Sequence, residues 1–579
     1  MGFLSKLGPK KPYFGLKGGW LTFWITVACA TDMTLFGYDQ GVFGGVIVTP
    51  DFLKVHNLEG EANTSLVGTV TAIYDIGCFV GAVAACWIGE ILGRKKTVLL
   101  GTTVMGVGAI LQISSFSVGQ MIAGRIIAGI GNGLNTATAP VWQTETSQVK
   151  WRGKLVVIEL IMNIAGFSLS NWMTYGFSYA GGPISWRFPL AFQFFFIIIL
   201  YMTVPWLPES PRWLIAHEYE DEAFQILADL EDKDSNDPFI LTQHKEIVYT
   251  VQYERENAPR WLDLLKGKTG DKGGTCTMRR LILGAGTQFM QQFAGINVTS
   301  YYLPTVLITS VGLTNELARL LAACNSVSYL LFSLIGIPNV ERWGRRKMLM
   351  YAAAGQFFCY LMITILLGLN AQPQYGTDAK TKLAAASVAF FFLYYIFFGI
   401  GFQGVPWLYP TEINSLAMRT KGAAIGTATN WMCNFIVVEI TPIGIQTLGW
   451  QFYIIWVVFN LSFVPTVYFF YPETADRTLE DLDAYYRDSP PLLVFRDKDA
   501  TSSKRPAKYA TKEEEDIRRA SGVDAAMFRR GSRVSMTNRG TGRTQSTDDW
   551  EKARTDASSE HTHVDNTKMS SDFGGKAEV

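Results

Sequence analysis

The chain has 579 residues, of which 48% are hydrophobic, 13% aromatic and only 17% charged, and its mean hydropathy is +0.14. This composition is too apolar for a soluble protein, and a net charge of +1 gives no sign of the basic surface of a nucleic-acid-binding protein. The cysteines show no paired spacing and the histidines all lie outside the apolar stretches, so we expect neither a disulfide framework nor a metal site.

The apolar residues form long stretches from residue 21 onward. A helix needs about 20 mostly apolar residues to cross the hydrocarbon core of a bilayer. Twelve stretches of suitable length lie at residues 21–45, 66–89, 97–116, 119–140, 155–177, 188–207, 279–305, 317–339, 347–369, 384–408, 421–441 and 451–471. The sequence therefore predicts an all-α membrane protein with twelve transmembrane helices, in two halves at residues 21–207 and 279–471.

Polar segments precede, divide and follow the two halves. Residues 1–20 are basic and lead into a stretch too long for a signal peptide, so the first stretch is expected to span the membrane. Residues 208–278 form a linker, and Ser210-Pro211 near its start is a good N-cap and first-turn pair, which predicts short linker helices. Residues 472–579 form a tail whose later part is rich in Ser, Thr, Asp, Lys and Arg, which is typical of disorder.

The tail also carries weak modification signals. Arg529-Arg530-Gly531-Ser532 resembles a kinase site, and lysines such as Lys504, Lys508 and Lys512 are candidate ubiquitin acceptors. Both patterns have low specificity, and an unmodified, solvated tail explains them equally well. A kinase or ubiquitin ligase is thus only a candidate partner.

Basic residues in the short loops predict the orientation, because Lys and Arg mark the cytoplasmic side. They follow the second, fourth, eighth and tenth spans: Arg94, Lys95, Lys96, Lys150, Arg152, Lys154, Arg342, Arg345, Arg346, Lys347, Arg419 and Lys421. Both termini and the linker are therefore predicted to be cytoplasmic. A glycosylation sequon at Asn63 falls on the outer side, but its closeness to the second span favours a chance tripeptide.

The seventh span is unusually polar for a membrane helix. At helical spacing, one face carries Gln288, Gln291, Gln292, Gly295, Thr299 and Tyr302. Uncharged amides and hydroxyls suit a ligand with many hydroxyl groups, or they bind neighbouring helices. Asn297 points away from this face in an ideal helix. It joins the others only if the helix breaks near Gly295, as helices that line transporter sites do.

The two halves repeat each other. The matching segments are Glu145 to Arg152 and Glu412 to Arg419, GRK at 93–95 and GRR at 344–346, and PES at 208–210 and PET at 472–474. A six-span unit duplicated in this way is typical of alternating-access carriers, whose binding site lies between the halves near the middle of the membrane.

Several motifs point to a known family. They are GRKK (93–96), GRIIAGIGNG (124–133), PVWQTE (140–145), PESPRWL (208–214), QQFAGIN (291–297), ERWGRR (341–346), PWLYPTEI (406–413) and PET (472–474). With these motifs the sequence resembles the sugar porter family of the major facilitator superfamily over nearly all of residues 20–485. FGYDQG (36–41), Glu159 and NWMCNF (430–435) resemble fungal proton-coupled carriers of monosaccharides and of polyols such as glycerol. The resemblance implies a major facilitator fold of two six-helix halves with cytoplasmic linker helices.

The resemblance also implies which residues bind substrate. They are Gln291, Gln292, Asn297, Trp407, Asn430 and Asn434. Amides pair with neighbouring hydroxyls, and an aromatic ring covers the C–H face of a pyranose. Leu160 stands where hexose carriers have Gln, and Tyr329 stands where they have Asn, although Asn325 lies one turn earlier. These two departures leave room for a polyol.

Charged residues inside the spans are costly and are usually functional. Asp39 and Arg125 match a carboxylate–guanidinium pair that couples proton and sugar movement in symporters of the family. A carboxylate beside an arginine stays ionised, and it takes a proton when the arginine withdraws. The alternative is a static pair that holds the first half together. Asp75 and Glu159 are interpreted as structural partners or, if Asp39 does not carry the proton, as the next candidate proton sites.

Charges at the cytoplasmic ends match the inner salt-bridge network of the family. They are Arg94, Glu145, Arg152, Glu209, Arg345, Glu412, Arg419 and Glu473. Single exposed ion pairs contribute little, but several together can favour the outward-open state. The alternative is that these residues serve only the orientation in the membrane.

Together these features predict a secondary active transporter that imports a monosaccharide, hexose or pentose, with a proton across the plasma membrane. A glycerol or polyol–proton symporter and a hexose uniporter are alternatives, and a non-transporting nutrient sensor represents another class. No nucleophile–base set, metal box or phosphate loop appears in the sequence, so we expect no enzyme activity and no cofactor. The expected partners are a sugar or polyol, a proton and the lipid bilayer, with no nucleic acid.

Overall fold

The computed structural model describes residues 12–148, 152–259, 261–266, 276–477, 479–488 and 490–509. Within these residues every regular element is a helix. The first half contains α1 (Gly18–Val46), α2 (Pro50–Val55), α3 (Thr64–Leu92), α4 (Arg94–Ile113), α5 (Val118–Thr146), α6 (Arg152–Ser178), α7 (Ile184–Ala191) and α8 (Gln193–Thr203). Four helices follow in the linker: α9 (Pro211–Ala216), α10 (Glu220–Glu231), the longer α11 (Pro238–Asn257) and α12 (Trp261–Leu265).

The second half repeats this arrangement of long helices. It contains α13 (Thr277–Phe293), α14 (Ile296–Ser300), α15 (Leu303–Thr309), α16 (Asn315–Trp343), α17 (Arg345–Asn370), α18 (Thr377–Phe397), the π-helical turn η5 (Phe398–Phe402), α19 (Val405–Ile413), α20 (Arg419–Leu448) and α21 (Phe452–Phe470), followed by α22 (Leu479–Arg487) and α23 (Lys498–Thr501). Single 3-10 turns lie at Pro12–Gly15, Glu61–Asn63, Val204–Trp206, Leu416–Met418, Gly449–Gln451 and Val494–Arg496. Each of the twelve predicted spans coincides with one or more of the long helices.

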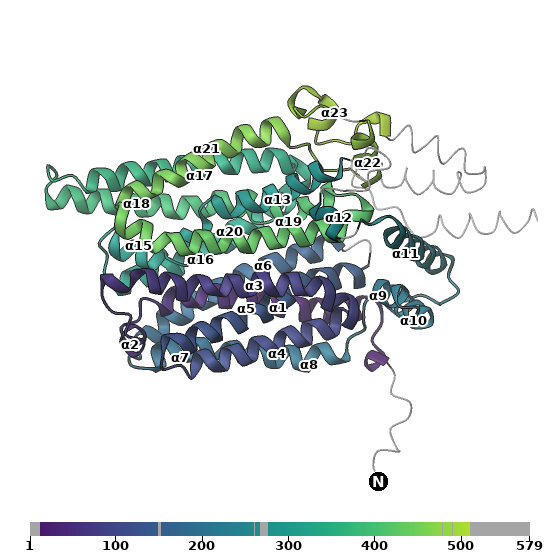
Figure 1. The fold of residues 1–579 in the computed structure, drawn as a ribbon, viewed down its shortest axis with the longest axis horizontal. Coiled ribbons are helices and arrows are strands. Elements are labelled where there is room, and N and C mark those ends of the chain that lie inside the picture. The colour runs from purple at the N-terminus through teal and green to yellow at the C-terminus, as the bar shows by residue number, and fades with distance from the viewer. Residues whose placement is uncertain are drawn as a thin grey trace, which may run out of the picture. The chain divides into compact units, whose positions relative to one another are not determined.

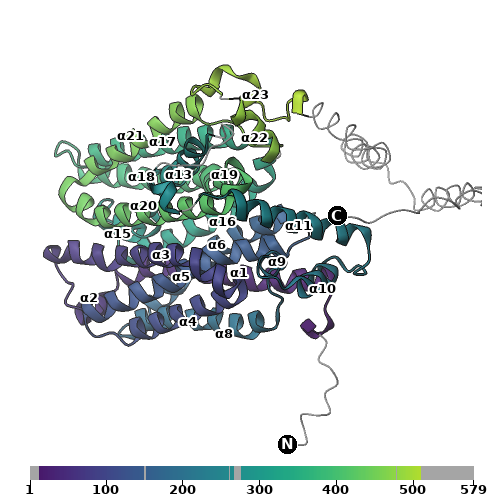
Figure 2. The ribbon, with the colours of Figure 1, turned by 45° about the vertical axis from the view of Figure 1, so that its right-hand side comes forward.

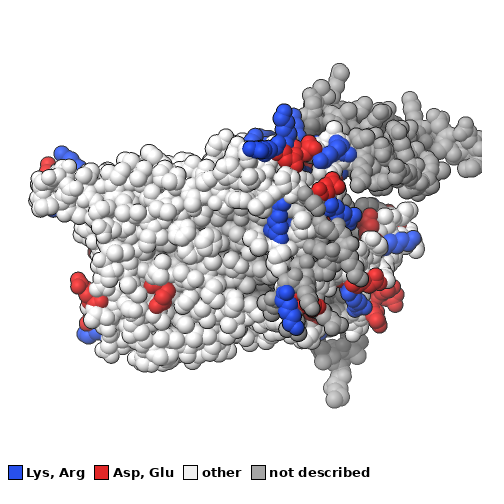
Figure 3. All heavy atoms as spheres, turned by 45° about the horizontal axis from the view of Figure 1, so that its top comes forward, with Lys and Arg blue, Asp and Glu red and all other residues white. Residues whose placement is uncertain are grey.

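The long helices run side by side in two layers, one from each half (Figure 1). Both ribbon views show α2 at one end of the bundle and the linker helices α9–α11 at the other (Figure 2), and α7 lies beside α2 in Figure 1. We call these the α2 end and the linker end. Charged side chains gather mainly at the linker end, and a broad face without Lys, Arg, Asp or Glu lies between the ends (Figure 3).

Among the described residues, seven helical segments are long and apolar enough to cross a membrane on length and composition alone. Other predicted spans carry more polar residues, and α13 has only 17 residues before its helix breaks. The prediction of an all-α protein with long membrane-spanning helices agrees with this architecture.

The seventh predicted span is broken near Gly295, the position at which a break allows Asn297 to join the polar face. Helix α13 ends at Phe293, Gly295 adopts a φ of +90°, and α14 begins at Ile296. Only glycine adopts this backbone conformation readily. A Cβ atom on Gly295 would also lie 2.5 Å from Oη of Tyr360. Backbone conformation and close packing therefore both require glycine at this position.

The two halves meet closely toward the α2 end. Arg319 of α16 donates to Oγ1 of Thr49 (3.0 Å) and to the carbonyl of Thr174 (3.3 Å), both in the first half. Oγ1 of Thr69 in α3 donates to Glu439 of α20 over 2.7 Å. The structure therefore shows the α2 end held by hydrogen bonds between the halves.

The beginning of the predicted tail packs against the second half at the linker end. Arg280 of α13 forms an ion pair with Asp483 of α22 (2.5 Å), and its guanidinium lies 4.9 Å from the ring centre of Tyr486. This contact shows that the segment just after the last span is anchored; most of the tail for which the sequence predicts disorder lies outside the described residues. The proposed modification sites Lys512 and Ser532 lie outside the described residues.

Candidate functional site

A cavity of about 60 Å³ lies between the two halves. Helices α1 and α6 of the first half line it, together with α13, α14, α16, η5, α19 and α20 of the second half. All six residues predicted to bind substrate line this cavity: Gln291, Gln292, Asn297, Trp407, Asn430 and Asn434. A space of this size holds only a few water molecules.

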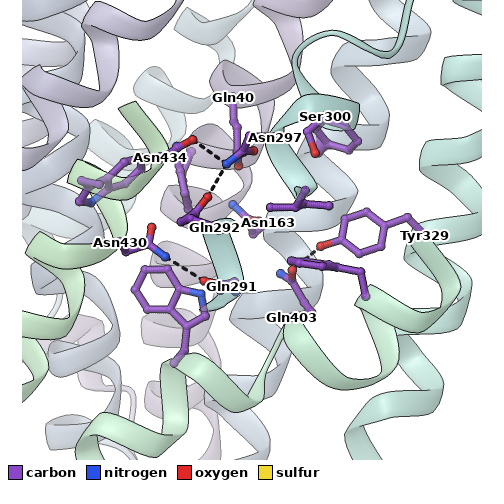
Figure 4. A pocket seen from close by; sticks show the side chains of 16 residues that line it. Gln40, Asn163, Gln291, Gln292, Asn297, Ser300, Tyr329, Gln403, Asn430 and Asn434 are labelled. Atoms are coloured by element: carbon purple, nitrogen blue, oxygen red, sulfur yellow. Dashed lines mark hydrogen bonds between the residues drawn. The ribbon is translucent and has the colours of Figure 1, made fainter. Parts of the chain in front are cut away.

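The lower amides in the close-up view hold one another in fixed orientations (Figure 4). Nδ2 of Asn430 donates to Oε1 of Gln291 (2.8 Å) and to Oε1 of Gln288 (2.6 Å). The two glutamines in turn donate to the backbone of the tenth span, Gln291 to the carbonyl of Phe402 and Gln288 to that of Pro406, both over 2.8 Å. Gln288 thus supports the site without lining the cavity.

Asn297 is the centre of a second amide group. Its Nδ2 donates to Oε1 of Gln292 and to Oδ1 of Asn434, both over 2.5 Å. From the first half, Nε2 of Gln40 approaches Oδ1 of Asn297 at 3.4 Å. The break at Gly295 brings Asn297 and Gln292 together, because the two would lie on different faces of a continuous helix.

The cavity also contains residues that the sequence did not single out. Polar examples are Gln40, Asn163, Ser300 and Gln403, and aromatic ones are Phe36, Phe167, Phe398 and Trp431. Gln40 stands next to Asp39 in the FGYDQG motif, so the motif already contained a signal for it. Phe36 lies in the same motif and Trp431 in NWMCNF, whereas the others come from helices whose rotation toward the cavity the sequence alone does not show.

Tyr329 and Leu160, the two residues that differ from the hexose-carrier pattern, lie differently with respect to the cavity. Tyr329 lines the cavity and donates through its hydroxyl to Oε1 of Gln403, so it occupies one wall of the site. Leu160 is not among the lining residues. Asn325 is buried in α16 away from the cavity, and its amide makes no hydrogen bond within the described residues.

Asp39 and Arg125 are both fully buried but form no ion pair in this structure. The guanidinium of Arg125 lies between two aromatic rings, 4.0 Å from the centre of Phe43 and 4.4 Å from that of Tyr74. Its Nη2 donates to the carbonyl of Thr71 over 2.9 Å. Cation–π contacts and this hydrogen bond hold the guanidinium apart from the carboxylate, although their charges are near enough to interact.

The charges at the linker end form two sets with the same geometry, one in each half. In the first half, Arg94 donates from Nε to Glu145 (2.9 Å) and from its backbone N–H to Glu209 (2.9 Å). Ser210 donates to the same Glu145 over 2.6 Å. The repeated segments of the sequence therefore build a structural unit as well as a sequence pattern.

In the second half, Arg345 takes the place of Arg94. It donates to Glu412 through its guanidinium (2.7 Å) and to Glu473 through its backbone N–H (2.8 Å). Thr474 donates to the same Glu412 over 2.6 Å. Arg419 begins α20, and the side chain of Arg152 lies outside the described part of the chain. A lock that joins the halves remains a prediction.

Glu209 and Glu473 directly follow the last predicted span of each half. Burial raises the pKa of Glu209 and of Glu473 above the ordinary value of a glutamate. Backbone N–H groups pointing at each carboxylate, and the neighbouring arginine, oppose this effect. Backbone donors thus stabilise the two charges where side-chain packing would disfavour them.

Comparison with known proteins agrees with this architecture. Residues 24–486 match the family described as "Sugar (and other) transporter". The MFS-type transporter oryC of Aspergillus oryzae is 63% identical, over 88% of this chain and 94% of that protein. The sugar transporter STL1 of Saccharomyces cerevisiae is 33% identical, over 84% of each chain.

A solved structure of XylE, titled a proton:xylose symporter bound to 6-bromo-6-deoxy-D-glucose, has the same fold. Its TM-score is 0.66 at 24% sequence identity, and the match covers 80% of this chain and 99% of that one.

Proposed function

The chain belongs to the sugar transporter family of the major facilitator superfamily, and on that premise we propose that it imports a monosaccharide together with a proton. The observation that carries this proposal is the amide-lined cavity between the halves. Its six predicted contacts are uncharged and converge on a space at the break between α13 and α14. Such a set recognises hydroxyl groups and disfavours an ion, which would need charged partners.

The position of the site supports alternating access. The cavity lies between two six-helix halves that share their architecture, and hydrogen bonds join the halves toward the α2 end. Rocking of one half against the other exposes such a site to each side in turn. With both termini cytoplasmic, as the basic loops indicate, the α2 end faces outward and this conformation is closed toward the outside. We place the protein in the plasma membrane.

Proton coupling is assigned to Asp39 and Arg125. Both are buried in the first half and their charges interact, yet the aromatic rings of Phe43 and Tyr74 hold the arginine away from the carboxylate. A buried carboxylate without a counter-charge in contact binds a proton readily. The arrangement therefore corresponds to the arginine-withdrawn step of the proposed cycle.

A polyol such as glycerol is the second candidate substrate. The cavity of about 60 Å³ is small, and the side chain of Tyr329, bonded to Gln403, fills the wall where hexose carriers have an asparagine. The name of the similar STL1 protein says only that it transports sugar, and the name of oryC gives no substrate. The size of the cavity is thus the observation that favours a polyol.

Uptake of radiolabelled D-glucose, D-xylose and glycerol in a transport-deficient host, with and without an uncoupler, tests the proposal. We expect one of these compounds to accumulate and the uncoupler to abolish its accumulation. Uptake that equilibrates but ignores the uncoupler would identify a uniporter. No uptake of any of the three, with the protein present at the cell surface, would contradict the proposal and favour a sensor.

A further inference from the structure

Asp75 is a buried carboxylate that the proposed cycle does not use. It lies on α3 in the first half, with no exposed surface. Its Oδ1 accepts a hydrogen bond from Nδ2 of Asn434 on α20, in the second half, over 3.1 Å. Its Oδ2 is buried and makes no hydrogen bond with the described residues. A buried charge is costly, so a carboxylate with one free oxygen is a candidate for protonation.

The partner of Asp75 is part of the substrate cavity. Asn434 lines the cavity, and its Oδ1 accepts from Nδ2 of Asn297 over 2.5 Å. Asn297 also donates to Gln292. A continuous chain of hydrogen bonds therefore runs from the cavity to Asp75 and crosses from one half of the protein to the other (Figure 4 shows its cavity portion).

Asp75 also belongs to the charged group of the first half. Its charge interacts with that of Arg125 on α5 and with that of Asp39 on α1. The other titratable groups near it are Cys78 on its own helix and Tyr301 and Tyr302 of the second half. Cysteine and tyrosine ordinarily titrate above neutral pH. Arg125 and Asp39 thus supply the neighbouring charges, and Asp75 is the carboxylate that also contacts a cavity residue.

We propose that Asp75 is a positioning residue through which proton binding acts on the substrate site, an inference that rests on the proposed proton-coupled transport. When ionised, Asp75 holds the amide of Asn434 by a charge-assisted hydrogen bond, which is stronger than a neutral one. When Oδ2 takes a proton from the outer solution, an O–H bond forms and the charge is lost; this proton is bound in addition to the one that Asp39 carries. The hydrogen bond from Asn434 to Asp75 then weakens, and the amide of Asn434 can donate to a substrate hydroxyl instead.

The same step affects the contact between the halves. The bond between Asp75 and Asn434 joins α3 to α20, so protonation loosens the halves at the level of the cavity. Substrate and proton therefore favour each other's binding, and release of one favours release of the other, as linkage requires. Loss of the proton on the inner side restores the charge and re-forms the bond.

Substrate affinity as a function of pH tests the role of Asp75. The binding of D-glucose, D-xylose and glycerol to the purified full-length protein is measured in acidic and in alkaline buffer. The wild type should bind its substrate about tenfold more tightly in acid, the difference between a charged and a neutral hydrogen bond. Asp75→Asn should bind with the acid-form affinity at both pH values and should lose concentrative uptake in vesicles. Asp75→Glu should restore part of the pH dependence.

Asp32→Asn is the matched control. Asp32 is also a buried carboxylate of the first half, and its Oδ1 accepts from Asn135 over 2.7 Å, but this bond stays within that half and does not reach the cavity. The control should keep the pH dependence of the wild type. If Asp75→Asn does not fold, Asp75→Ser, a smaller neutral replacement, is titrated in the same way.

Two results would overturn the role of Asp75. One is wild-type binding that does not depend on pH. The other is pH dependence that persists in Asp75→Asn and disappears in Asp39→Asn. A wild type that binds none of the three compounds would instead contradict the proposed function, so the two failures are distinguishable.

Discussion

At the scale of single residues, the candidate site is a set of amides that hold one another in place. Asn297 donates to Gln292 and to Asn434, and Asn430 donates to Gln291 and to Gln288. A substrate hydroxyl that enters must replace some of these bonds, and each amide it meets is already oriented. Loss of one amide therefore removes a contact and also disorders its neighbours.

Asn297→Ala should raise the KM for uptake by roughly 5- to 100-fold, or abolish uptake, at unchanged surface expression. A buried hydrogen bond that water cannot replace contributes about 1–3 kcal/mol. Uptake kinetics over a range of substrate concentrations give the measurement. Asn325→Ala is the matched control, because Asn325 is buried in α16 away from the cavity. Wild-type kinetics in Asn297→Ala would show that this amide does not bind substrate.

Asp39→Asn should abolish accumulation against a gradient while counterflow at symmetric pH continues. The amide mimics the protonated carboxylate, so the carrier can exchange loaded substrate, but it can no longer return empty after releasing a proton. Vesicles with an imposed pH gradient provide the measurement. Accumulation that persists in Asp39→Asn would move the proton site to another carboxylate.

At the scale of elements, the break between α13 and α14 is the feature that forms the site. It depends on Gly295, whose φ of +90° is unfavourable for other residues and whose missing side chain leaves room for Tyr360. The hydroxyl of Tyr360 donates to the carbonyl of Gly295 over 2.7 Å, which satisfies one of the backbone groups freed by the break.

Gly295→Ala should destabilise the protein by about 1–3 kcal/mol, because the methyl group meets both backbone strain and Tyr360. It should also raise the KM, since Asn297 then shifts. Thermal unfolding of the purified protein and uptake kinetics are the two measurements. Gly176→Ala on α6 has no atom within 4 Å of the new methyl group and should unfold like the wild type. Equal stability of the two variants would contradict the role assigned to the break.

At the scale of the whole molecule, the two halves are held together toward the α2 end. Arg319 is buried and reaches from α16 to Thr49 and to the carbonyl of Thr174 in the first half. Its Nε also donates to Asn315 within its own helix (2.7 Å). One substitution at this residue therefore removes two of the hydrogen bonds that link the halves at this end.

Arg319→Ala should open the α2 end. Maleimide labelling of a cysteine introduced at Ser300, which lines the cavity, should become several-fold faster from the α2 side. Arg187→Ala is the control, because Arg187 lies toward the same end but donates to the carbonyl of Ser115 within the first half (3.1 Å). Equal labelling rates in the two variants would show that Arg319 does not close this end.

The charge sets at the linker end allow a paired test of the predicted lock. Glu412→Gln removes the charge that Arg345 binds, and Glu145→Gln makes the same change at Arg94 in the first half. Both should shift the resting population toward inward-open forms, measured as faster labelling of the cavity cysteine from the linker side. An unchanged labelling pattern in both variants would mean that the charges serve the fold and orientation alone.

The sequence by itself determined the features that depend on residues close together in the chain. The apolar stretches predicted the helices, and the repeated motifs at Arg94 and Arg345 predicted that the chain consists of two similar halves. The polar face of the seventh span, with Asn297 out of line, predicted a break near Gly295. Local backbone preference and helical spacing are sufficient for such predictions.

Only the tertiary structure decided which distant residues meet. Asp75 and Asn434 are 359 positions apart, and their hydrogen bond depends on the rotation of α3 and α20 about their axes and on how the halves pack. The same holds for Arg125. The sequence suggested that it pairs with Asp39, but in the structure it lies between the rings of Phe43 and Tyr74. Helical periodicity defines the faces of one helix, but packing between helices selects the partner that each face contacts.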